Sequence, residues 1–280
     1  MARLLEGRPI AERIKEELRK EIQNLKIRPV LASILVGENS SSEVYIKSQQ
    51  KTAESLGVIY QLHRLNQNIT EEALIEFINK LNSDNSVHGI IIQMPFPNQI
   101  DYKKISQYIL PEKDVEGMHP KNIGKLLFGK AELLPCTPSA VMELLNSIKL
   151  DLYGKEVVVV GHSEIVGKPL SLLLLNKFAT VTVCHIATSQ AGRLEEHVKD
   201  AEILIVAVGK AGVIKGNWIR QDAIVIDVGI NRLGDKIVGD VEFEEAQKRA
   251  AWITPVPGGV GPLTVTMLMR NLIEAVRMQI

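Results

Sequence analysis

The chain has 280 residues, enough for two domains of ordinary size, and its hydrophobic share of 45% and charged share of 24% are typical of a globular protein. Its 33 basic residues balance 33 acidic ones, so net charge favours neither a nucleic-acid partner nor an anionic membrane surface. Cys136 and Cys184 lack the spacing of a zinc site or a disulfide framework, and no apolar stretch has the length of a membrane span or a signal core. These features predict a cytoplasmic enzyme without a metal site.

The first half of the chain alternates amphipathic helical patterns with short apolar strand patterns. Ser40, with Glu43 three residues later, is a capping pattern for the second of the helices. Because strands that alternate with helices form parallel sheets, this half is predicted to be one α/β unit. In chain order the expected elements are a helix at 8–25, a strand at 29–36, a helix at 41–56, a strand at 58–64, a helix at 70–81 and a strand at 88–94.

A polar stretch that contains several prolines, residues 111–138, separates the halves, and the alternation then resumes. The last helix is longer than a nucleotide-binding domain needs, so we expect it to pack on the first half. The predicted domains are therefore 1–138 with 264–280, and 139–263. The expected elements of the second half are helices at 139–148, 169–178, 190–199, 242–250 and 263–278 and strands at 157–160, 180–185, 203–208, 223–228 and 252–254.

The segment VVVVGHSEIVGKP (157–169) has the pattern of a phosphate-binding turn. Four valines predict a strand buried on both faces, Gly161 ends it, and the N-terminus of the following helix offers free N–H groups to an anion. The glycine spacing is not the common G-x-G-x-x-G, so an ordinary strand-to-helix turn in a doubly wound sheet remains an alternative. The next strand lacks the terminal carboxylate that binds a ribose 2′-hydroxyl, and only His162 and His185 offer positive charge there. This pattern leaves NAD and NADP both open.

Several motifs occur in a characteristic order along the whole chain. They are VGENSSSEVYIKSQQKTAE (36–54), HGIIIQMPFP (88–97), PEKDVEGMHP (111–120), LLPCTPSA (133–140), VVVVGHSEIVGKP (157–169), AIVIDVGINR (223–232) and ITPVPGGVGPLT (253–264). With these motifs the chain resembles, end to end, the bacterial bifunctional methylenetetrahydrofolate dehydrogenase/cyclohydrolase family.

This resemblance implies an α/β fold of two domains, an N-terminal folate-binding domain and a Rossmann-like nucleotide domain with a parallel sheet, with a cleft between them. It also implies a homodimer and a role in one-carbon metabolism that serves purine biosynthesis. The family oxidises 5,10-methylenetetrahydrofolate to the 5,10-methenyl cation with NADP or NAD and then hydrolyses that cation to 10-formyltetrahydrofolate. Its partners are thus small molecules, a tetrahydrofolate substrate and a nicotinamide cofactor, with neither nucleic acid nor membrane.

The resemblance assigns four residues to the folate chemistry. Tyr45 matches a tyrosine that stacks on folate, and Gln49, one helical turn later, stands where the family has its acid–base lysine. Gln93 matches the glutamine that binds this lysine, and Glu116 stands where an aspartate usually holds the pterin ring. The other substrate-site residues that the resemblance implies are Ile92, Met94, Pro257, Gly258, Gly259, Val260 and Gly261.

Glutamine at position 49 affects the two steps of the family reaction differently. Hydride loss leaves a stabilised cation and depends mainly on placement beside the nicotinamide, whereas hydrolysis needs a group that activates water and protonates the leaving nitrogen. An amide does not titrate near neutral pH, and Lys47 and Lys51 do not share the helix face of Tyr45 and Gln49. We therefore predict a dehydrogenase with weak or absent cyclohydrolase activity. The alternatives are a catalytically impaired folate- or nucleotide-binding homologue and another two-domain NAD(P) dehydrogenase.

The resemblance also places Gly161, His162 and Ser163 on the cofactor phosphates and ribose. The family often has arginine where His162 stands, and often serine after the histidine that matches His185, where this chain has Ile186. Both polar contacts expected for a 2′-phosphate are altered, so NADP is the expected cofactor with NAD a serious option. The nicotinamide pocket is expected to be bordered by Ile230.

Overall fold

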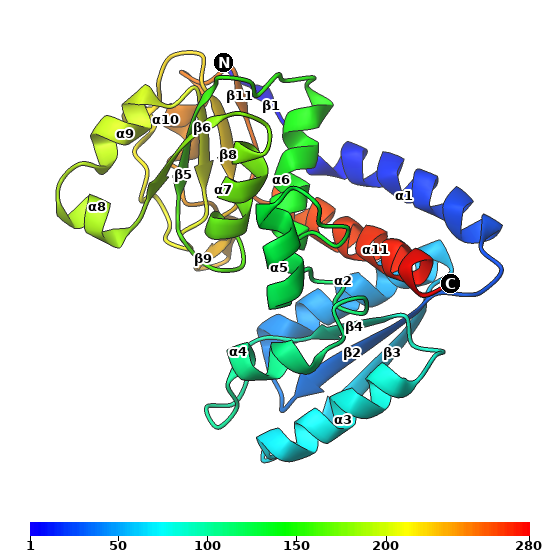
Figure 1. Ribbon diagram of the computed structural model, residues 1–280. Helices are drawn as coiled ribbons and strands as arrows, with labels where there is room; N and C mark the ends of the chain where they lie inside the picture. The colour runs from blue at the N-terminus through cyan, green and yellow to red at the C-terminus, as the bar shows by residue number, and fades with distance from the viewer. The chain divides into compact units, whose positions relative to one another are not determined.

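The computed structural model describes the backbone of residues 1–280 and the side chains of all of them except residues 40 and 41. The chain forms two compact units (Figure 1), residues 1–12 with 137–264, and residues 13–136 with 265–280. We call them the six-stranded unit and the three-stranded unit after their main sheets. The cap expected at Ser40 lies outside the described side chains. Among the described residues, no helix combines the length and apolar character needed to cross a membrane.

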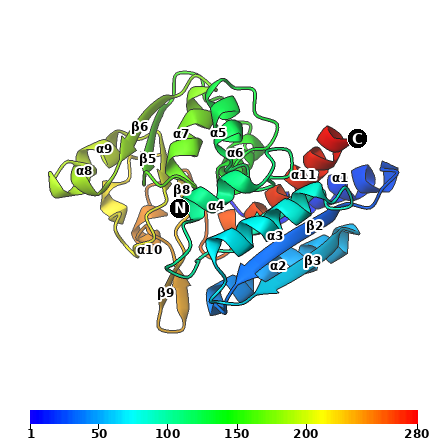
Figure 2. The ribbon, with the colours of Figure 1, turned by 60° about the horizontal axis from the view of Figure 1, so that its bottom comes forward.

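The sheet of the three-stranded unit is parallel, with the strand order β3-β2-β4. Alternation along β2 directs Ala32 and Ile34 toward a core that includes Leu74 and Ile78 of α3, while Ser33 faces the opposite side, where it accepts a hydrogen bond from Gln93. Figure 2 shows α3 lying along this sheet. The elements of this unit are β2 (Val30–Val36), α2 (Ser40–Leu56), β3 (Ile59–Leu65), α3 (Glu71–Ser83), β4 (Gly89–Ile92), α4 (Tyr102–Ile105), the 3-10 helix η1 (Ser106–Tyr108) and α5 (Pro120–Leu127).

Two long helices connect the units and belong to both. Helix α1 (Gly7–Asn24) begins in the six-stranded unit, and α11 (Val260–Gln279) begins there and ends in the three-stranded unit. In the three-stranded unit the amide of Asn271 donates to the carbonyls of Val115 and Leu134 at 2.8 and 2.7 Å. Residues 265–280 therefore complete the core of the three-stranded unit.

The sheet of the six-stranded unit is parallel throughout, with the strand order β1-β11-β8-β7-β5-β6. After the edge strand β1, the chain returns to this sheet at β5 and adds β6 on one side and β7, β8 and β11 on the other, so the order reverses between β5 and β7. In a doubly wound sheet such a reversal opens a ligand crevice at the carboxyl ends of the two strands. The strands are β1 (Arg3–Leu4), β5 (Glu156–Val160), β6 (Thr180–Cys184), β7 (Ile203–Val206), β8 (Ile224–Asp227) and β11 (Trp252–Ile253).

Short helices and a hairpin surround this sheet. They are α6 (Cys136–Ser147), α7 (Gly167–Leu175), α8 (Ile186–Gln190), α9 (Leu194–Asp200), the 3-10 helix η2 (Gly216–Trp218), α10 (Phe243–Ala246) and the antiparallel pair β9 (Asn231–Leu233) and β10 (Lys236–Val238). Together the two units confirm the predicted two-domain α/β class with a parallel sheet in the nucleotide half.

Three local expectations differ from the structure. The helix expected at 190–199 is two helices, α8 and α9, because Gly192 between them adopts a φ of +71°. The helix expected at 242–250 is confined to Phe243–Ala246. Residues 1–12, placed by the sequence-based boundary with the first domain, group with the six-stranded unit because β1 pairs with β11 through Arg3–Trp252 and Leu4–Ile253.

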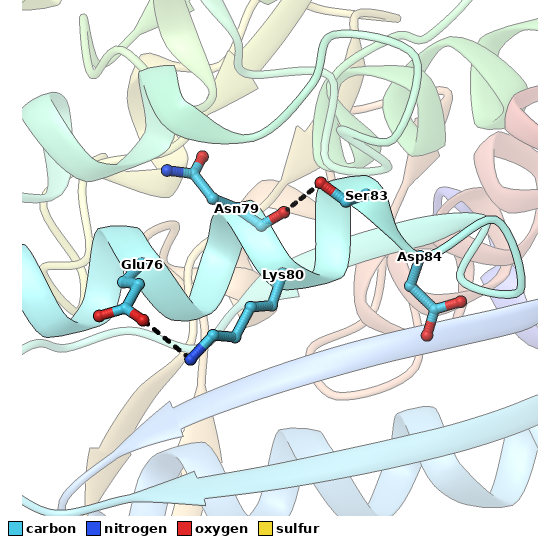
Figure 3. Close-up of a pocket in the computed structure, with 5 residues that line it drawn as sticks. All are labelled: Glu76, Asn79, Lys80, Ser83 and Asp84. Carbon is cyan, nitrogen blue, oxygen red and sulfur yellow. Dashed lines mark hydrogen bonds and ion pairs between the residues drawn. The ribbon is translucent and has the colours of Figure 1, made fainter.

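A buried lysine closes the C-terminal end of α3. Lys113 is only 4% exposed, and its Nζ donates to the carbonyls of Leu81, Asn82 and Asp84 at 3.1, 2.8 and 2.8 Å. The final carbonyls of a helix lack partners within the helix, so a cation there satisfies them and complements the helix dipole. The outer surface of the same helix end, drawn in Figure 3, carries instead an exposed ion pair between Glu76 and Lys80.

We expect Lys113→Met to lower the free energy of unfolding by roughly 3 kcal/mol, because a hydrogen bond to a charged group contributes about 1.5–3 kcal/mol and several carbonyls lose their donor together. Urea unfolding followed by circular dichroism measures the change. The matched control is Lys80→Met on the solvent side of the same helix, which should leave stability nearly unchanged. Equal changes in the free energy of unfolding in the two variants would show that the contacts of Lys113 add no more stability than the exposed ion pair of Lys80.

Candidate active site

An amide network lies at the centre of the three-stranded unit. Gln49 of α2 is fully buried, and its Oε1 accepts hydrogen bonds from the Tyr60 hydroxyl at 2.8 Å and from Gln93 Nε2 at 2.9 Å. Gln93 Nε2 also donates to Ser33 Oγ at 3.0 Å. These partners come from β2, β3 and the end of β4, so the sheet holds the Gln49 amide in one orientation.

Two phenols contact this network. Tyr45 lies one turn before Gln49 on α2, and the Gln49 side chain lowers the pKa of the Tyr45 hydroxyl, as expected of neighbours on one helix face. Burial raises the pKa of Tyr45 well above its ordinary value, and the nearby Cys136 and Glu116 raise it further. Burial likewise raises the pKa of Tyr60 to about 12. Both phenols therefore keep their protons at neutral pH and act as hydrogen-bond donors rather than bases.

Glu116 is a carboxyl whose charge acts on Tyr45. Burial, together with the smaller effect of the Asp114 carboxyl two residues earlier, raises the pKa of Glu116 to about 8. Asp114 Oδ2 accepts hydrogen bonds from the His119 N–H at 2.7 Å and from Asn122 Nδ2 at 3.0 Å. The Asp114 carboxylate therefore stabilises the turn between these residues. At neutral pH most Glu116 is protonated and can donate as well as accept a hydrogen bond.

The lysines near this site lie apart from the amide network. Lys47 and Lys51 are exposed on α2, whereas Gln49 between them is fully buried. Lys113, in the same segment as Glu116, donates its hydrogen bonds to the carbonyls at the end of α3. The partners of Gln49 are thus neutral amides and phenols.

The six-stranded unit has a cavity of about 310 Å3 at the carboxyl ends of β5 and β7, where the strand order reverses. Its size is at the lower end of small-molecule cavities, which run from roughly 300 to 1,000 Å3. The predicted cofactor residues among its lining are Gly161, His162, Ser163, His185 and Ile186. The lining residues that sequence reasoning missed are Val160, Ser189, Leu194, Ala207, Val208, Lys210 and Val213. Ala207 and Val208 directly follow β7, so a prediction of where the strand order reverses would have identified them.

The two glycines of the predicted phosphate turn are required by close backbone approach. Gly161 has a φ of +124°, and a Cβ there would lie 2.3 Å from the carbonyl oxygen of Ala207. A Cβ at Gly167, the first residue of α7, would lie 2.0 Å from the Gly161 carbonyl oxygen. The turn is therefore compact enough for its backbone to approach a phosphate closely.

Groups able to carry positive charge meet in this cavity. The rings of His162 and His185 are tilted against each other with centroids 5.1 Å apart, and Lys210 lines the same cavity. His185 directly follows β6, the position at which dinucleotide folds bind the adenosine ribose. No carboxylate occurs in the described lining, so nothing there repels a 2′-phosphate.

The residues Pro257 to Gly261 belong to the six-stranded unit. Gly258 has a φ of +118°, and its carbonyl accepts the Gly7 N–H at 2.9 Å, while the Gly259 N–H donates to Pro255 at 2.8 Å. Val260 and Gly261 form the first turn of α11 rather than a loop. This segment is therefore a tight turn that begins a helix.

Two family models match the chain: the catalytic domain of tetrahydrofolate dehydrogenase/cyclohydrolase over residues 5–116, and its NAD(P)-binding domain over residues 135–280. The chain belongs to the tetrahydrofolate dehydrogenase/cyclohydrolase family. The resemblance seen in the sequence motifs is thereby confirmed.

Relatives of this family are similar over the full chain. The bifunctional protein FolD of Bacillus pumilus is 49% identical over 280 residues, 99% of this chain and 98% of that protein. A solved FolD methylenetetrahydrofolate dehydrogenase/cyclohydrolase from Campylobacter jejuni gives a TM-score of 0.96 at 45% identity and covers 100% of both chains. The Trypanosoma brucei enzyme, solved with NADP and an inhibitor, gives a TM-score of 0.94 at 38% identity, covering 99% of this chain and 98% of that one.

The structure gives the surroundings of three further residues that the family resemblance linked to ligands. The Ile92 side chain is 2% exposed and packs in the core with Ile34 and Ile90. Met94 is 48% exposed, and its carbonyl accepts the Ser42 hydroxyl at 2.7 Å. Ile230 is 68% exposed and does not line the cavity at Gly161. Among the described side chains, no group of three or more His, Cys, Asp or Glu is placed to hold a metal ion.

Proposed function

We propose that this protein oxidises 5,10-methylenetetrahydrofolate to 5,10-methenyltetrahydrofolate with NADP or NAD and hydrolyses the product only weakly. Membership of the family and its full-length relatives named as bifunctional enzymes support the substrate and the first reaction. The observation that carries the second part is the buried Gln49 amide, held by Tyr60 and Gln93 at the position that the motif match gives to the family lysine.

The dehydrogenase step places few demands on protein acids and bases. When bound, the nicotinamide ring supplies the hydride acceptor, and the methenyl product is a resonance-stabilised cation. The protein's part is to bind and orient the reactants. Tyr45 offers an aromatic face, Glu116 offers a carboxyl for the polar edge of the pterin, and the Gly161 turn offers backbone N–H groups to the cofactor phosphates. None of these roles requires a lysine at position 49.

Hydrolysis of the cation requires a proton acceptor for water and a proton donor for the leaving nitrogen. Gln49 provides neither, and the raised pKa values of Tyr45 and Tyr60 keep both phenols protonated. Glu116 favours a second candidate function, retention of both activities, because its pKa of about 8 makes it able to exchange protons near neutral pH. In the proposed function this carboxyl is instead committed to the pterin ring.

The test is to incubate purified protein with 5,10-methylenetetrahydrofolate and NADP or NAD, and to follow the near-ultraviolet absorbance of methenyltetrahydrofolate. We expect methenyltetrahydrofolate to accumulate and then to decay no faster than in buffer. Formation of reduced cofactor and 10-formyltetrahydrofolate without methenyl accumulation would support the bifunctional alternative. Folate binding with no turnover would instead support an impaired homologue.

We further propose that NADP is preferred and NAD also used, since the cavity offers the Lys210 ammonium and the hydrogen-bonding rings of His162 and His185 but no arginine. Replacing His162 by arginine should raise the ratio of kcat/KM for NADP to that for NAD roughly tenfold, because a guanidinium binds a phosphate through two hydrogen bonds. Initial rates with each cofactor measure the ratio. The control is His197→Arg on α9, outside the cavity lining. An unchanged ratio in the His162 variant would place the 2′-phosphate elsewhere.

Assembly and cellular role are also part of the proposal. Strand β6 is an edge of its sheet, and Val183, Leu175 and Phe178 near it are exposed, which favours pairing with a second copy of this chain as a homodimer. Light scattering at micromolar concentration tests this. Family membership supports a cytoplasmic role in one-carbon supply to purine biosynthesis, which growth of a strain lacking its own enzyme on purine-free medium would test.

A further inference from the structure

Two buried aspartates in the six-stranded unit lie behind the wall of the cofactor cavity. Asp227 is the last residue of β8 and is 4% exposed, and Asp240, after β10, is fully buried. Buried carboxylates are retained in proteins only where hydrogen bonds compensate their lost hydration. The contacts of these two residues therefore indicate what they hold in place.

Asp240 binds a turn that follows β7. Its Oδ2 accepts the N–H groups of Val208 and Gly209 at 2.7 and 2.9 Å, and its Oδ1 accepts the Lys210 N–H at 2.9 Å. Asn231 Nδ2 donates to the same Oδ1 at 2.8 Å. Successive backbone N–H groups that converge on one point form an anion-binding nest, and here the protein's own carboxylate fills it.

This nest is part of the cavity described above. Val208 and Lys210 both line the cavity, and their N–H groups point away from it toward Asp240. Gly209 between them has a φ of +73°, which gives the turn its shape. The turn follows β7, one of the two strands between which the sheet order reverses.

Asp227 in turn fixes Asp240. Its Oδ1 accepts the Asp240 N–H at 3.0 Å and the Gly229 N–H at 2.9 Å, and its Oδ2 accepts the Val241 N–H at 2.9 Å. The packing leaves no room for side chains beside the carboxylates: a Cβ at Gly229 would lie 2.2 Å from the Asp240 carboxyl, and one at Gly239 would lie 2.0 Å from Asp227 Oδ2. Burial raises the pKa of Asp227 to about 6, so it is mostly ionised at neutral pH.

We propose that Asp240, held by Asp227, is a positioning residue for the dinucleotide cofactor. By filling the nest at Val208–Lys210, its carboxylate preforms the cavity wall and directs the Lys210 side chain to the ligand. It also leaves the Gly161 turn as the place for the cofactor's phosphates. This inference rests on the proposal that the cavity binds NADP or NAD.

The first experiment removes the carboxylate and restores it with a small molecule. In Asp240→Gly, which leaves space for acetate, we expect the KM for NADP to rise roughly tenfold, the effect of about 1.4 kcal/mol, with the KM for methylenetetrahydrofolate changed less than about twofold. Acetate should recover most of this loss, whereas chloride at the same ionic strength should not. Asp235→Asn, an exposed acid in the turn of the same hairpin, is the matched control and should behave as the wild-type protein.

The second experiment uses the wild-type protein and does not depend on a variant that folds. Amide hydrogen exchange at Val208, Gly209 and Lys210 should be slow without cofactor and nearly unchanged when NADP is added, because Asp240 already holds these groups. Fast exchange that slows only with NADP would overturn the proposal. So would an Asp240→Gly protein with unchanged KM for NADP, or one whose two KM values rise equally without acetate rescue. Failure of the wild-type protein to bind either cofactor would instead contradict the proposed function.

Discussion

Replacing Gln49 by lysine is expected to raise the rate of methenyltetrahydrofolate hydrolysis by roughly 10²–10⁴-fold, the usual contribution of a positioned acid–base group. The site is fully buried, and Gln93 Oε1, which lies 3.5 Å from Gln49 Nε2, can accept a hydrogen bond from the new ammonium. Burial lowers the pKa of a lysine toward neutrality, which is the range in which it can both accept and release a proton. The decay of methenyltetrahydrofolate absorbance, corrected for the buffer reaction, measures the gain.

The matched control for this substitution is Gln50→Lys at the next position of the same helix. Gln50 is exposed and donates to Glu54 within α2, so a lysine there adds the same charge on the outer face of the helix. Hydrolysis should be unchanged in this control, and dehydrogenase activity should be retained in both variants. A Gln49→Lys protein that folds, keeps its dehydrogenase activity and gains no hydrolysis would contradict the assignment of position 49 to proton transfer.

The second large effect is expected in the pH profile and depends on Glu116. Because the ionised carboxylate accepts hydrogen bonds from the N–H groups of a pterin, kcat/KM for methylenetetrahydrofolate should rise with pH and level off above a pKa of about 8. Glu116→Gln should remove this dependence and lower the plateau by roughly 10–100-fold, the loss of one charge-assisted hydrogen bond of about 1.5–3 kcal/mol. Rates between pH 6 and 9.5 measure both effects, with Glu112→Gln in the same segment as the control.

The free energy of unfolding is expected to depend on Glu116 in the opposite direction: it should fall as the pH rises. Burial raises the pKa of Glu116 from 4.5 in the unfolded chain to about 8 in the folded one, so the folded state favours the protonated form. Its contribution to stability is full below pH 4.5 and is lost as the pH rises through about 8. The wild-type Tm should therefore fall relative to that of Glu116→Gln between pH 6 and 9. Two results together would contradict these assignments to Glu116. They are a difference in Tm between the wild-type protein and Glu116→Gln that does not change with pH, and a wild-type kcat/KM that does not change with pH.

Local patterns in the sequence determined much of this protein. The runs VLASILV and VVVV predict buried parallel strands because strands covered on both faces need apolar residues at every position, and both are buried in the structure. The spacing of Tyr45 and Gln49 places them on one helix face because the α-helix repeats every 3.6 residues, and in the structure the Gln49 side chain affects the pKa of the Tyr45 hydroxyl. The order of short motifs was sufficient to identify the family.

Contacts between distant segments were decided only by the tertiary structure. Arg3 and Leu4 join the six-stranded sheet through β11, and Asp240 holds a turn about thirty residues earlier at Val208. The raised pKa of Glu116 likewise depends on burial, which its neighbours in sequence do not reveal. Helical periodicity and strand burial are properties of a few consecutive residues, so the sequence determines them directly. Strand partners, the ligands of a buried carboxylate and the exposure of a carboxyl depend on which distant segments pack together, so only the folded chain decides them.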